Sequence, residues 1–334
     1  MGCPERMMRA GAPGSPKRAG GVVLLSVLLI LALLAALAWQ LVTRHSLTIA
    51  QARFAFTADL ATSYALGGEA LARQLMAQEW IDGDNSKDTL LEAWAQPVAP
   101  FEIDNGFLEV QVRDLNGCFN LNSLAGTDPA RNLSRLKTLL RNRNLPETLA
   151  DAWKDWVDPD QDITAFGAED GEYLLAEPPY RTADGPAGHV SEFRLLRDFE
   201  PEMWEAIGNT LCVLPTEDLS INVNTASAAV LAALNPALSE AQLEPFIEAQ
   251  RDYASVAQVT SEFPELADAV DALTVTSEYF EIQVRAQVDD TLAELASVIR
   301  RNPADGSITL ISRDFGKDFR SLFTVQSDED APSS

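Results

Sequence analysis

The chain has 334 residues, of which 50 are acidic and 25 basic, so its formal net charge is −25 and its sequence pI is about 4.3. A surface this acidic repels phosphate backbones and argues against nucleic acid as a partner, whereas it suits divalent cations and basic protein surfaces. Hydrophobic residues make up 46% of the chain, which is enough to build a buried core in one or two domains.

An apolar stretch begins close to the N-terminus. Four basic residues precede residues 22–42, which are apolar apart from Ser26 and Gln40 and a few small residues. Since a helix rises about 1.5 Å per residue, a helix over this stretch matches the ~30 Å hydrocarbon core of a bilayer. We expect residues 22–42 to cross a membrane once, with residues 1–21 on the cytoplasmic side because of their positive charge.

The junction before this stretch resembles a processing site. An ordinary secretory signal ends its apolar core in a small-x-small cleavage site, and no such site follows Trp39. Gly20 and Gly21 lie before the apolar stretch instead. Cleavage after Gly21 would remove a short leader and leave Val22 as the first residue, which is the arrangement of type IV prepilins and pseudopilins. An uncleaved signal anchor is the alternative that the junction leaves open.

The chain contains three cysteines. Cys3 lies in the leader, so Cys118 and Cys212 would remain in a segment placed outside the cytoplasm. In an oxidising compartment the two thiols most simply form a disulfide; two buried reduced cysteines are the alternative. The spacing of cysteines and of the two histidines, His45 and His189, does not indicate a zinc site.

Helical periodicity continues after the apolar stretch through residues 43–81. Ala61, Ala65, Leu71 and Leu75 are among the apolar residues that recur at helical spacing. This pattern predicts an amphipathic helix that packs one face on a globular head.

A β-hairpin should follow, with residues 101–103 and 107–113 as its arms. The turn Asn105-Gly106 favours positive φ angles, and the second arm alternates apolar and polar residues. A second group of strand patterns covers residues 279–288, 291–299 and 308–311. We therefore expect one antiparallel sheet formed by segments 82–119 and 278–325, and a flexible acidic tail over 326–334.

Residues 120–277 separate the two halves of this sheet and carry helical patterns. The expected fold class is thus α+β: a pilin-like long N-terminal helix packed on an antiparallel sheet, with a large all-α domain inserted into the sheet region. The insertion contains a weak duplication, since Asn120-Leu121-Asn122 and Asn222-Val223-Asn224 each precede helical patterns.

The second of these segments resembles the opening of a DNA-binding helix-hairpin-helix. That motif needs a glycine-containing hairpin whose backbone approaches phosphates, but residues 235–238 contain no glycine. A membrane-anchored DNA-uptake protein would also need a basic face. We therefore interpret the segment as a capped structural helix pair.

The strongest candidate for a binding site is an acidic loop. Asp158, Asp160 and Asp162 with Glu169 occupy positions one, three, five and twelve of an EF-hand pattern, and Asp170 follows. Carboxylates at alternate positions can converge on calcium, but position six is Ile163 where an EF-hand has glycine. The sequence thus predicts an irregular calcium loop, with a solvated acidic turn as the alternative. No catalytic motif is present, and we expect no enzymatic activity.

Several features together resemble one family. They are, in chain order, the basic leader with Gly21 before the apolar helix, residues 114–122, residues 156–160 with 167–170, residues 177–180, residues 192–196 and residues 221–226. In order and spacing they are similar to the K family of minor pseudopilins of type II secretion. The resemblance covers nearly the whole chain.

This resemblance implies a calcium-binding, pilin-like protein with an inserted helical domain, anchored in the inner membrane with its C-terminal head in the periplasm. It implies cleavage by a prepilin peptidase between Gly21 and Val22, and calcium ligands at Asp158, Asp160, Glu169 and Asp170, with Asp162 as a further candidate. It also implies a place at the pseudopilus tip with the I, J and H minor pseudopilins, and a part in export of folded proteins. Most pseudopilins carry a glutamate five residues into the mature helix; here that residue is Ser26. Val22 stands where the methylated N-terminal residue of pilins is commonly Phe or Met.

Overall fold

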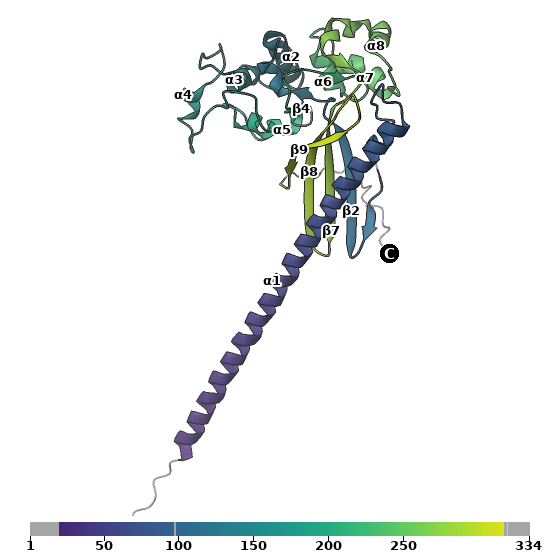
Figure 1. The fold of residues 1–334 in the computed structure, drawn as a ribbon. Coiled ribbons are helices and arrows are strands. Elements are labelled where there is room, and N and C mark those ends of the chain that lie inside the picture. Colours follow the sequence, from purple (N-terminus) through teal and green to yellow (C-terminus); the bar gives the residue numbers. More distant parts are fainter. Residues whose placement is uncertain (1–19, 97, 317–318, 320–334) are drawn as a thin grey trace, which may run out of the picture. The chain divides into compact units, whose positions relative to one another are not determined.

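The computed structural model describes residues 20–96, 98–316 and 319 (Figure 1). The leader up to residue 19 and the acidic tail from residue 326 lie outside these residues. The chain divides into two units, the first ending at Thr57 and the second beginning at Ala58. Helix α1 (Gly20–Asp82) runs through both. In the first unit the side chains of residues 22–42 are exposed, and the helix is long and apolar enough to cross a membrane.

In the second unit, small residues dominate the face of α1 that packs on the sheet. Ala61, Ala65 and Ala72 are buried, together with Met76. The predicted core positions Leu71 and Leu75 are instead more than a third exposed, so that part of the prediction was wrong. Small side chains on the inner face let the helix backbone approach the sheet, and the bulkier leucines are turned outward as a result.

Within the described residues, five antiparallel strands form the sheet, in the order β1-β2-β7-β8-β9. Their bounds are Phe101–Ile103, Gly106–Asp114, Tyr279–Val288, Thr291–Arg301 and Ile308–Asp314. The predicted hairpin is confirmed, with Asn105 at a φ of 59° in its turn. Strands β2 and β7 are neighbours although the inserted domain separates them in sequence, and Asp114 pairs with Phe280 at the end of their ladder.

Helix and sheet approach each other closely at Gly68. A Cβ atom placed there would lie 2.8 Å from Val284 Cγ1 and 3.1 Å from Val110 Cγ2. The neighbouring Gly67 faces open space, with nothing within 4 Å of such an atom. The glycine pair therefore does not interrupt the helix; its second member permits contact with β2 and β7.

A buried carboxylate fixes the same region of the helix. Glu69 is fully buried and accepts hydrogen bonds from Ser297 on β8 at 2.8 Å and from Arg313 on β9 at 2.6 and 3.0 Å. Burial alone would raise the pKa of Glu69, but the hydrogen bonds from Arg313 and Ser297 hold it below its ordinary value. A hydrogen bond to β8 and an ion pair with β9 thus join α1 to these two strands.

Residues between β2 and β7 form the helical domain. Its helices are η2 (Leu121–Ala125), α2 (Pro129–Asn142), α3 (Thr148–Val157), α4 (Asp170–Tyr173), η3 (Val190–Leu195), α5 (Met203–Ile207), α6 (Ala228–Ala233), α7 (Glu240–Glu248), α8 (Val256–Glu262) and η4 (Pro264–Ala272). Trp153, Phe193 and Phe246 are among the largest side chains of its core.

The two halves of this domain repeat one plan. In the first, the short strands β3 (Phe119–Asn120) and β4 (Leu211–Cys212) pair in parallel; in the second, β5 (Ile221–Asn222) and β6 (Leu273–Thr274) do the same. The helices of each half lie between its two strands in sequence.

The second asparagine of each Asn-x-Asn motif makes equivalent bonds in the two halves. Asn122 accepts from the backbone N–H of Ala187 at 2.8 Å and donates to its carbonyl at 3.1 Å. Asn224 makes the same pair of bonds with Tyr253, at 2.9 and 3.1 Å. These matching bonds support the duplication that the sequence indicated.

The predicted disulfide is present. Cys118, next to β3, and Cys212, at the end of β4, are bonded with a Cα–Cα distance of 5.9 Å and a sequence separation of 94 residues. It encloses the first half of the helical domain.

We expect Gly68→Leu to lower the free energy of unfolding by about 3 kcal/mol or more, because the new side chain would collide with Val110 and Val284. Gly67→Leu is the matched control and should be neutral or stabilising by up to about 1 kcal/mol, since it only improves helix propensity. Urea unfolding of both variants measures the difference. Equal effects would contradict the close approach at Gly68.

Candidate functional site

The acidic loop begins where α3 ends. The backbone N–H of Asp158 donates to the carbonyl of Lys154 and closes the helix, and Trp153 and Trp156 hold its last two turns in the core. Trp156 also packs edge-on against Tyr173 in α4, with ring centroids 5.3 Å apart. The aromatic contact brings the two ends of the loop, after α3 and before α4, close together.

Asp155 is a member of the site that we did not predict. Its side chain is fully buried, and both carboxylate oxygens accept from the backbone N–H of Thr164, at 3.1 and 3.3 Å. A Cβ atom on Gly167 would lie 1.9 Å from Asp155 Oδ2, so glycine is required for this approach. Burial raises the pKa of Asp155. A sequence signal did exist, because Asp155 precedes Asp158 by three residues and so shares a helix face with it.

Glu169 is the most unusual carboxylate of the loop. It is 3% exposed, and neither of its oxygens has a hydrogen-bond partner. Asp158 Oδ1 is also buried without a partner. Burial, together with the nearby negative charges of Asp155, Asp158 and Asp184, raises the pKa of Glu169 to about 7. A buried, unpaired carboxylate is unfavourable unless a proton or a cation neutralises it.

Asp170 and the second oxygen of Asp158 already have partners. Lys154 Nζ lies 2.5 Å from Asp158 Oδ2, and Arg181 pairs with Asp170, which also accepts from the hydroxyl of Thr182 at 3.1 Å. Lys154 and Arg181 thus partly neutralise Asp158 and Asp170, the carboxylates at the two ends of the loop.

The outer part of the loop is more exposed. Asp160 accepts from the backbone N–H of Asp162 at 2.9 Å, while Asp162 itself is exposed. Asp184, which we did not predict, accepts from Thr182 Oγ1 at 2.7 Å and from Gln161 Nε2 at 2.9 Å. It belongs to a separate loop, and no sequence spacing points to it.

Of the predicted ligands, Asp158 and Asp160 lie close enough to Glu169 for their charges to raise its pKa, whereas Asp162 is exposed and Asp170 is paired with Arg181, so no finished cage is formed. In the described part of the chain, no three histidine, cysteine or acidic side chains are close enough to hold a metal ion. The donor set consists of hard oxygens, and the unpartnered oxygens of Glu169 and Asp158 fit the requirements of a divalent ion such as calcium.

The junction at the start of α1 has a simple local structure. The helix begins at Gly20, Val22 is exposed, and the Ser26 hydroxyl donates to the carbonyl of Val23 at 2.9 Å. Where most pseudopilins have a charged glutamate, this chain therefore has a neutral hydroxyl that hydrogen-bonds within its own helix.

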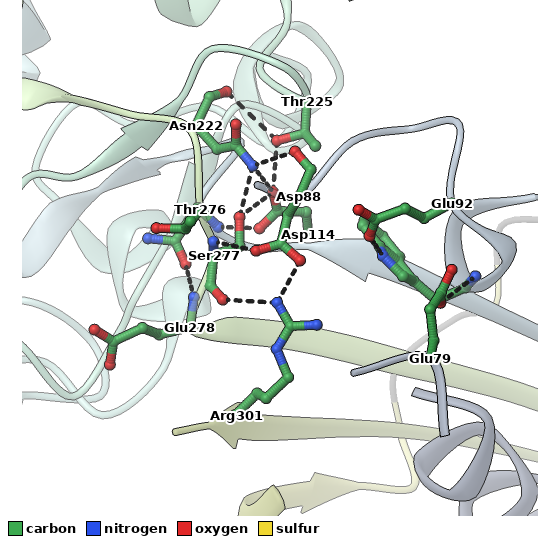
Figure 2. A network of polar contacts seen from close by, with 12 residues as sticks. Glu79, Asp88, Glu92, Asp114, Asn222, Thr225, Thr276, Ser277, Glu278 and Arg301 are labelled. Carbon is green, nitrogen blue, oxygen red and sulfur yellow. Dashed lines mark hydrogen bonds and ion pairs between the residues drawn. The ribbon is translucent and has the colours of Figure 1, made fainter. Parts of the chain in front are cut away.

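A second group of polar side chains lies where the helical domain joins the sheet (Figure 2). Asp114 at the end of β2 accepts from Ser277 Oγ at 2.6 Å, Thr225 Oγ1 at 2.5 Å and Asn222 Nδ2 at 3.2 Å. Burial raises the pKa of Asp114 to about 6, despite the bonds from Ser277 and Thr225. Asn222 is the first asparagine of the second Asn-x-Asn motif, and its function here is structural.

Asp88 completes this junction from the segment after α1. It pairs with Arg301 on β8 and accepts from the backbone N–H of Ser277 at 2.7 Å. The guanidinium of Arg301 stacks between Trp80 and Phe280, 4.9 and 4.8 Å from the ring centroids. The roles of Asp88, Asp114 and Arg301 could not be predicted from the sequence, because single charged residues far apart in the chain leave no spacing pattern.

Comparisons with known proteins agree with this architecture. Two family models, both described as Type II secretion system (T2SS), protein K, match residues 117–216 and 221–280. These two segments coincide with the two halves of the helical domain.

Relatives match over most of the chain. The type II secretion system protein K of Pseudomonas aeruginosa is 34% identical, covering 89% of this chain and 93% of its own length. The protein of the same name from Aeromonas hydrophila is 31% identical over 90% of this chain and 98% of its own.

A solved structure has the same fold. The crystal structure of the GspK-GspI-GspJ complex from enterotoxigenic Escherichia coli includes a chain that is 22% identical, with a TM-score of 0.65, covering 81% of this chain and 99% of that one. From the extent and identity of these matches, the chain belongs to the type II secretion system protein K family.

Proposed function

We propose that this protein is a minor pseudopilin at the tip of the type II secretion pseudopilus, and that it takes part in pseudopilus initiation and in export of folded periplasmic proteins across the outer membrane. The observation that carries the proposal is the large helical domain inserted between the neighbouring strands β2 and β7 of a pilin-like head. Family membership makes the chain a structural component of a secretion system rather than an enzyme.

The inserted domain argues for a cap and against a repeating subunit. Helices that pack side by side are spaced at roughly 8–10 Å, and a domain of this size on every subunit would obstruct such packing. Ser26 supports the same placement, since it supplies no carboxylate to pair with the N-terminal amine of a neighbouring subunit. A tip subunit has no neighbour above it and needs no such contact.

The proposed partners are the I, J and H minor pseudopilins. The related chain from enterotoxigenic Escherichia coli was crystallised with GspI and GspJ, which supports the first two. We further propose that a prepilin peptidase cleaves between Gly21 and Val22. The mature helix would then anchor the protein in the inner membrane, with the head in the periplasm.

Calcium is the proposed ligand of the acidic loop. Glu169 and Asp158 would contribute their unpartnered oxygens, with Asp160, Asp162 and Asp170 as the remaining ligands. Bound calcium would supply the positive charge that this group of carboxylates lacks. The protein's own part is to bury Glu169 and to bring Asp155 against the loop through Gly167.

The tip placement predicts one copy of the protein per filament end. Overproduction should shorten pseudopili by providing more caps, and deletion should impair both initiation and secretion. Quantitative mass spectrometry of purified filaments measures the copy number. A stoichiometry near that of the major subunit would refute the tip placement.

Processing should depend on the small side chain at position 21. Gly21→Leu is expected to leave the precursor uncut, because a peptidase that reads this junction has little room for a larger residue. The mass of the membrane-bound protein reports the outcome, and Val23→Leu is a control that should mature normally. Normal maturation of Gly21→Leu would rule out the assigned cleavage site.

Calcium should stabilise the protein by roughly 2.7 kcal/mol at a hundredfold excess over Kd, which corresponds to a rise in Tm on the order of 5–10 °C for a domain of this size. Glu169→Gln should abolish most of this shift, because it removes the buried charge while keeping the shape. Glu177→Gln, an exposed carboxylate nearby, is the control. If calcium shifts all three proteins equally, the loop is a solvated acidic turn.

Without divalent ions, the free energy of unfolding should fall as pH rises from 5 to 8. The folded-state pKa of Glu169 is raised to about 7 from an ordinary value of 4.5, so its protonated form stabilises the fold at low pH and this contribution is lost through pH 7. The raised pKa values of Glu92 and Asp114 also make the free energy of unfolding fall as pH rises. The test is therefore how the difference in free energy of unfolding between the wild type and Glu169→Gln changes with pH. This pH dependence should vanish in saturating calcium, which keeps Glu169 ionised throughout.

A further inference from the structure

Large apolar side chains are exposed beside the acidic loop. Phe166, Leu174, Leu175 and Leu195 have exposed fractions of 60, 45, 83 and 45%. We call these four residues the outer apolar patch. Figure 1 shows α4 and the loops on either side of it at the outer edge of the helical domain, away from α7 and α8. A domain of this kind normally buries such residues, so their grouping requires an explanation.

Hydrogen bonds and ring contacts hold the segments that carry the patch together. Arg197 Nη2 donates to the carbonyl of Phe166 at 3.3 Å, and its Nη1 lies 3.6 Å from Glu172, two residues before Leu174. Tyr180 donates its hydroxyl to the carbonyl of Leu195 at 2.7 Å. The ring of Tyr180 packs against that of Tyr173, next to Leu174, with centroids 5.3 Å apart. The four side chains therefore project from one connected unit.

The rest of the helical domain has few exposed residues of this kind. Among residues 119–274, all of which the structure describes, the large apolar side chains that are exposed are Ile163, Val270 and the four of the patch. Five of these six lie between residues 163 and 195. A concentration of this degree is typical of a protein interaction site and not of an ordinary surface.

The charge around the patch restricts the partner. Residues 158–205 contain thirteen acidic side chains and three arginines. The exposed carboxylates of Glu172, Glu177 and Asp198 lie within three residues of members of the patch. Such a rim repels a second copy of this chain and the anionic headgroups of a membrane, and it attracts a basic surface.

We propose that the outer apolar patch docks a different protein, one that presents apolar side chains within a basic surface. The proposal does not depend on the placement of this protein at a filament tip, because it rests on exposure and charge within the helical domain. Phe166 belongs to the acidic loop, so the proposed calcium ion would also order one part of the docking surface.

The test uses the full-length protein in secreting cells, with a photoreactive benzophenone amino acid at position 175 and, as a control, at position 270. Cells are irradiated before lysis, and the adducts are identified by mass spectrometry. We expect an adduct with a different protein from position 175 at a yield at least fivefold above that from position 270. An adduct with a second copy, an adduct with lipid, or none above the control would overturn the proposal.

Further substitutions, each combined with the photoreactive residue at position 175, test whether the patch itself makes the contact. Phe166→Ser and Glu177→Arg should each reduce the adduct yield from position 175 at least threefold. Glu265→Arg, an exposed carboxylate in the other half of the domain, should leave the yield unchanged. Copurification with the I and J pseudopilins should stay normal in all three, which shows that the head is folded. An adduct yield that Phe166→Ser and Glu177→Arg both leave unchanged refutes the docking surface.

Discussion

The structure depends on one constraint: a domain inserted between two neighbouring strands must begin and end at the same place. Asn116 meets this constraint most directly. Its side-chain carbonyl accepts from the backbone N–H groups of Glu278 and Tyr279 at 3.0 and 3.1 Å, and its amide donates to the carbonyl of Ser220 at 3.0 Å. One buried asparagine thus binds the segment that enters the helical domain, the connection between its halves and the segment that leaves it. Holding these three segments together keeps the ends of β2 and β7 adjacent where the helical domain is inserted.

Two buried glutamates show opposite ways of handling charge in this acidic protein. Glu69 is surrounded by donors from β8 and β9, and its charge contributes to the contact between helix and sheet. Glu169 has no donor and lies among other carboxylates. A buried carboxylate whose oxygens all accept hydrogen bonds is typical of a structural role. A buried carboxylate without hydrogen-bond donors is typical of a binding site. The contrast is the physical reason for proposing a ligand at the acidic loop and none in the region around Glu69.

Sequence patterns predicted those parts of the fold that depend on local periodicity and turn chemistry. The hairpin followed from Asn105-Gly106, and the disulfide from the cysteines left outside the leader. The failures have a common cause. Leu71 and Leu75 were placed in the core because large apolar residues usually are, but this helix approaches its sheet through alanine and glycine. The pairing of Asp88 with Arg301 spans 213 residues, and no periodicity records a contact of that length. At the acidic loop, the carboxylates were predicted, but their burial and partners were not, because these depend on the packing of Trp156 and Tyr173.

The disulfide has a mechanical consequence. Each half of the helical domain closes on a parallel pair of strands only two residues long, and such a pair resists little tension. In the first half, the bond between Cys118 and Cys212 lies beside this weak pair and bypasses it covalently. Tension applied across the two ends of this 94-residue segment is therefore carried by the disulfide, and the segment cannot be drawn out between them as an extended chain. The second half lacks such a bond within the described residues, so under load it is the half that would open first.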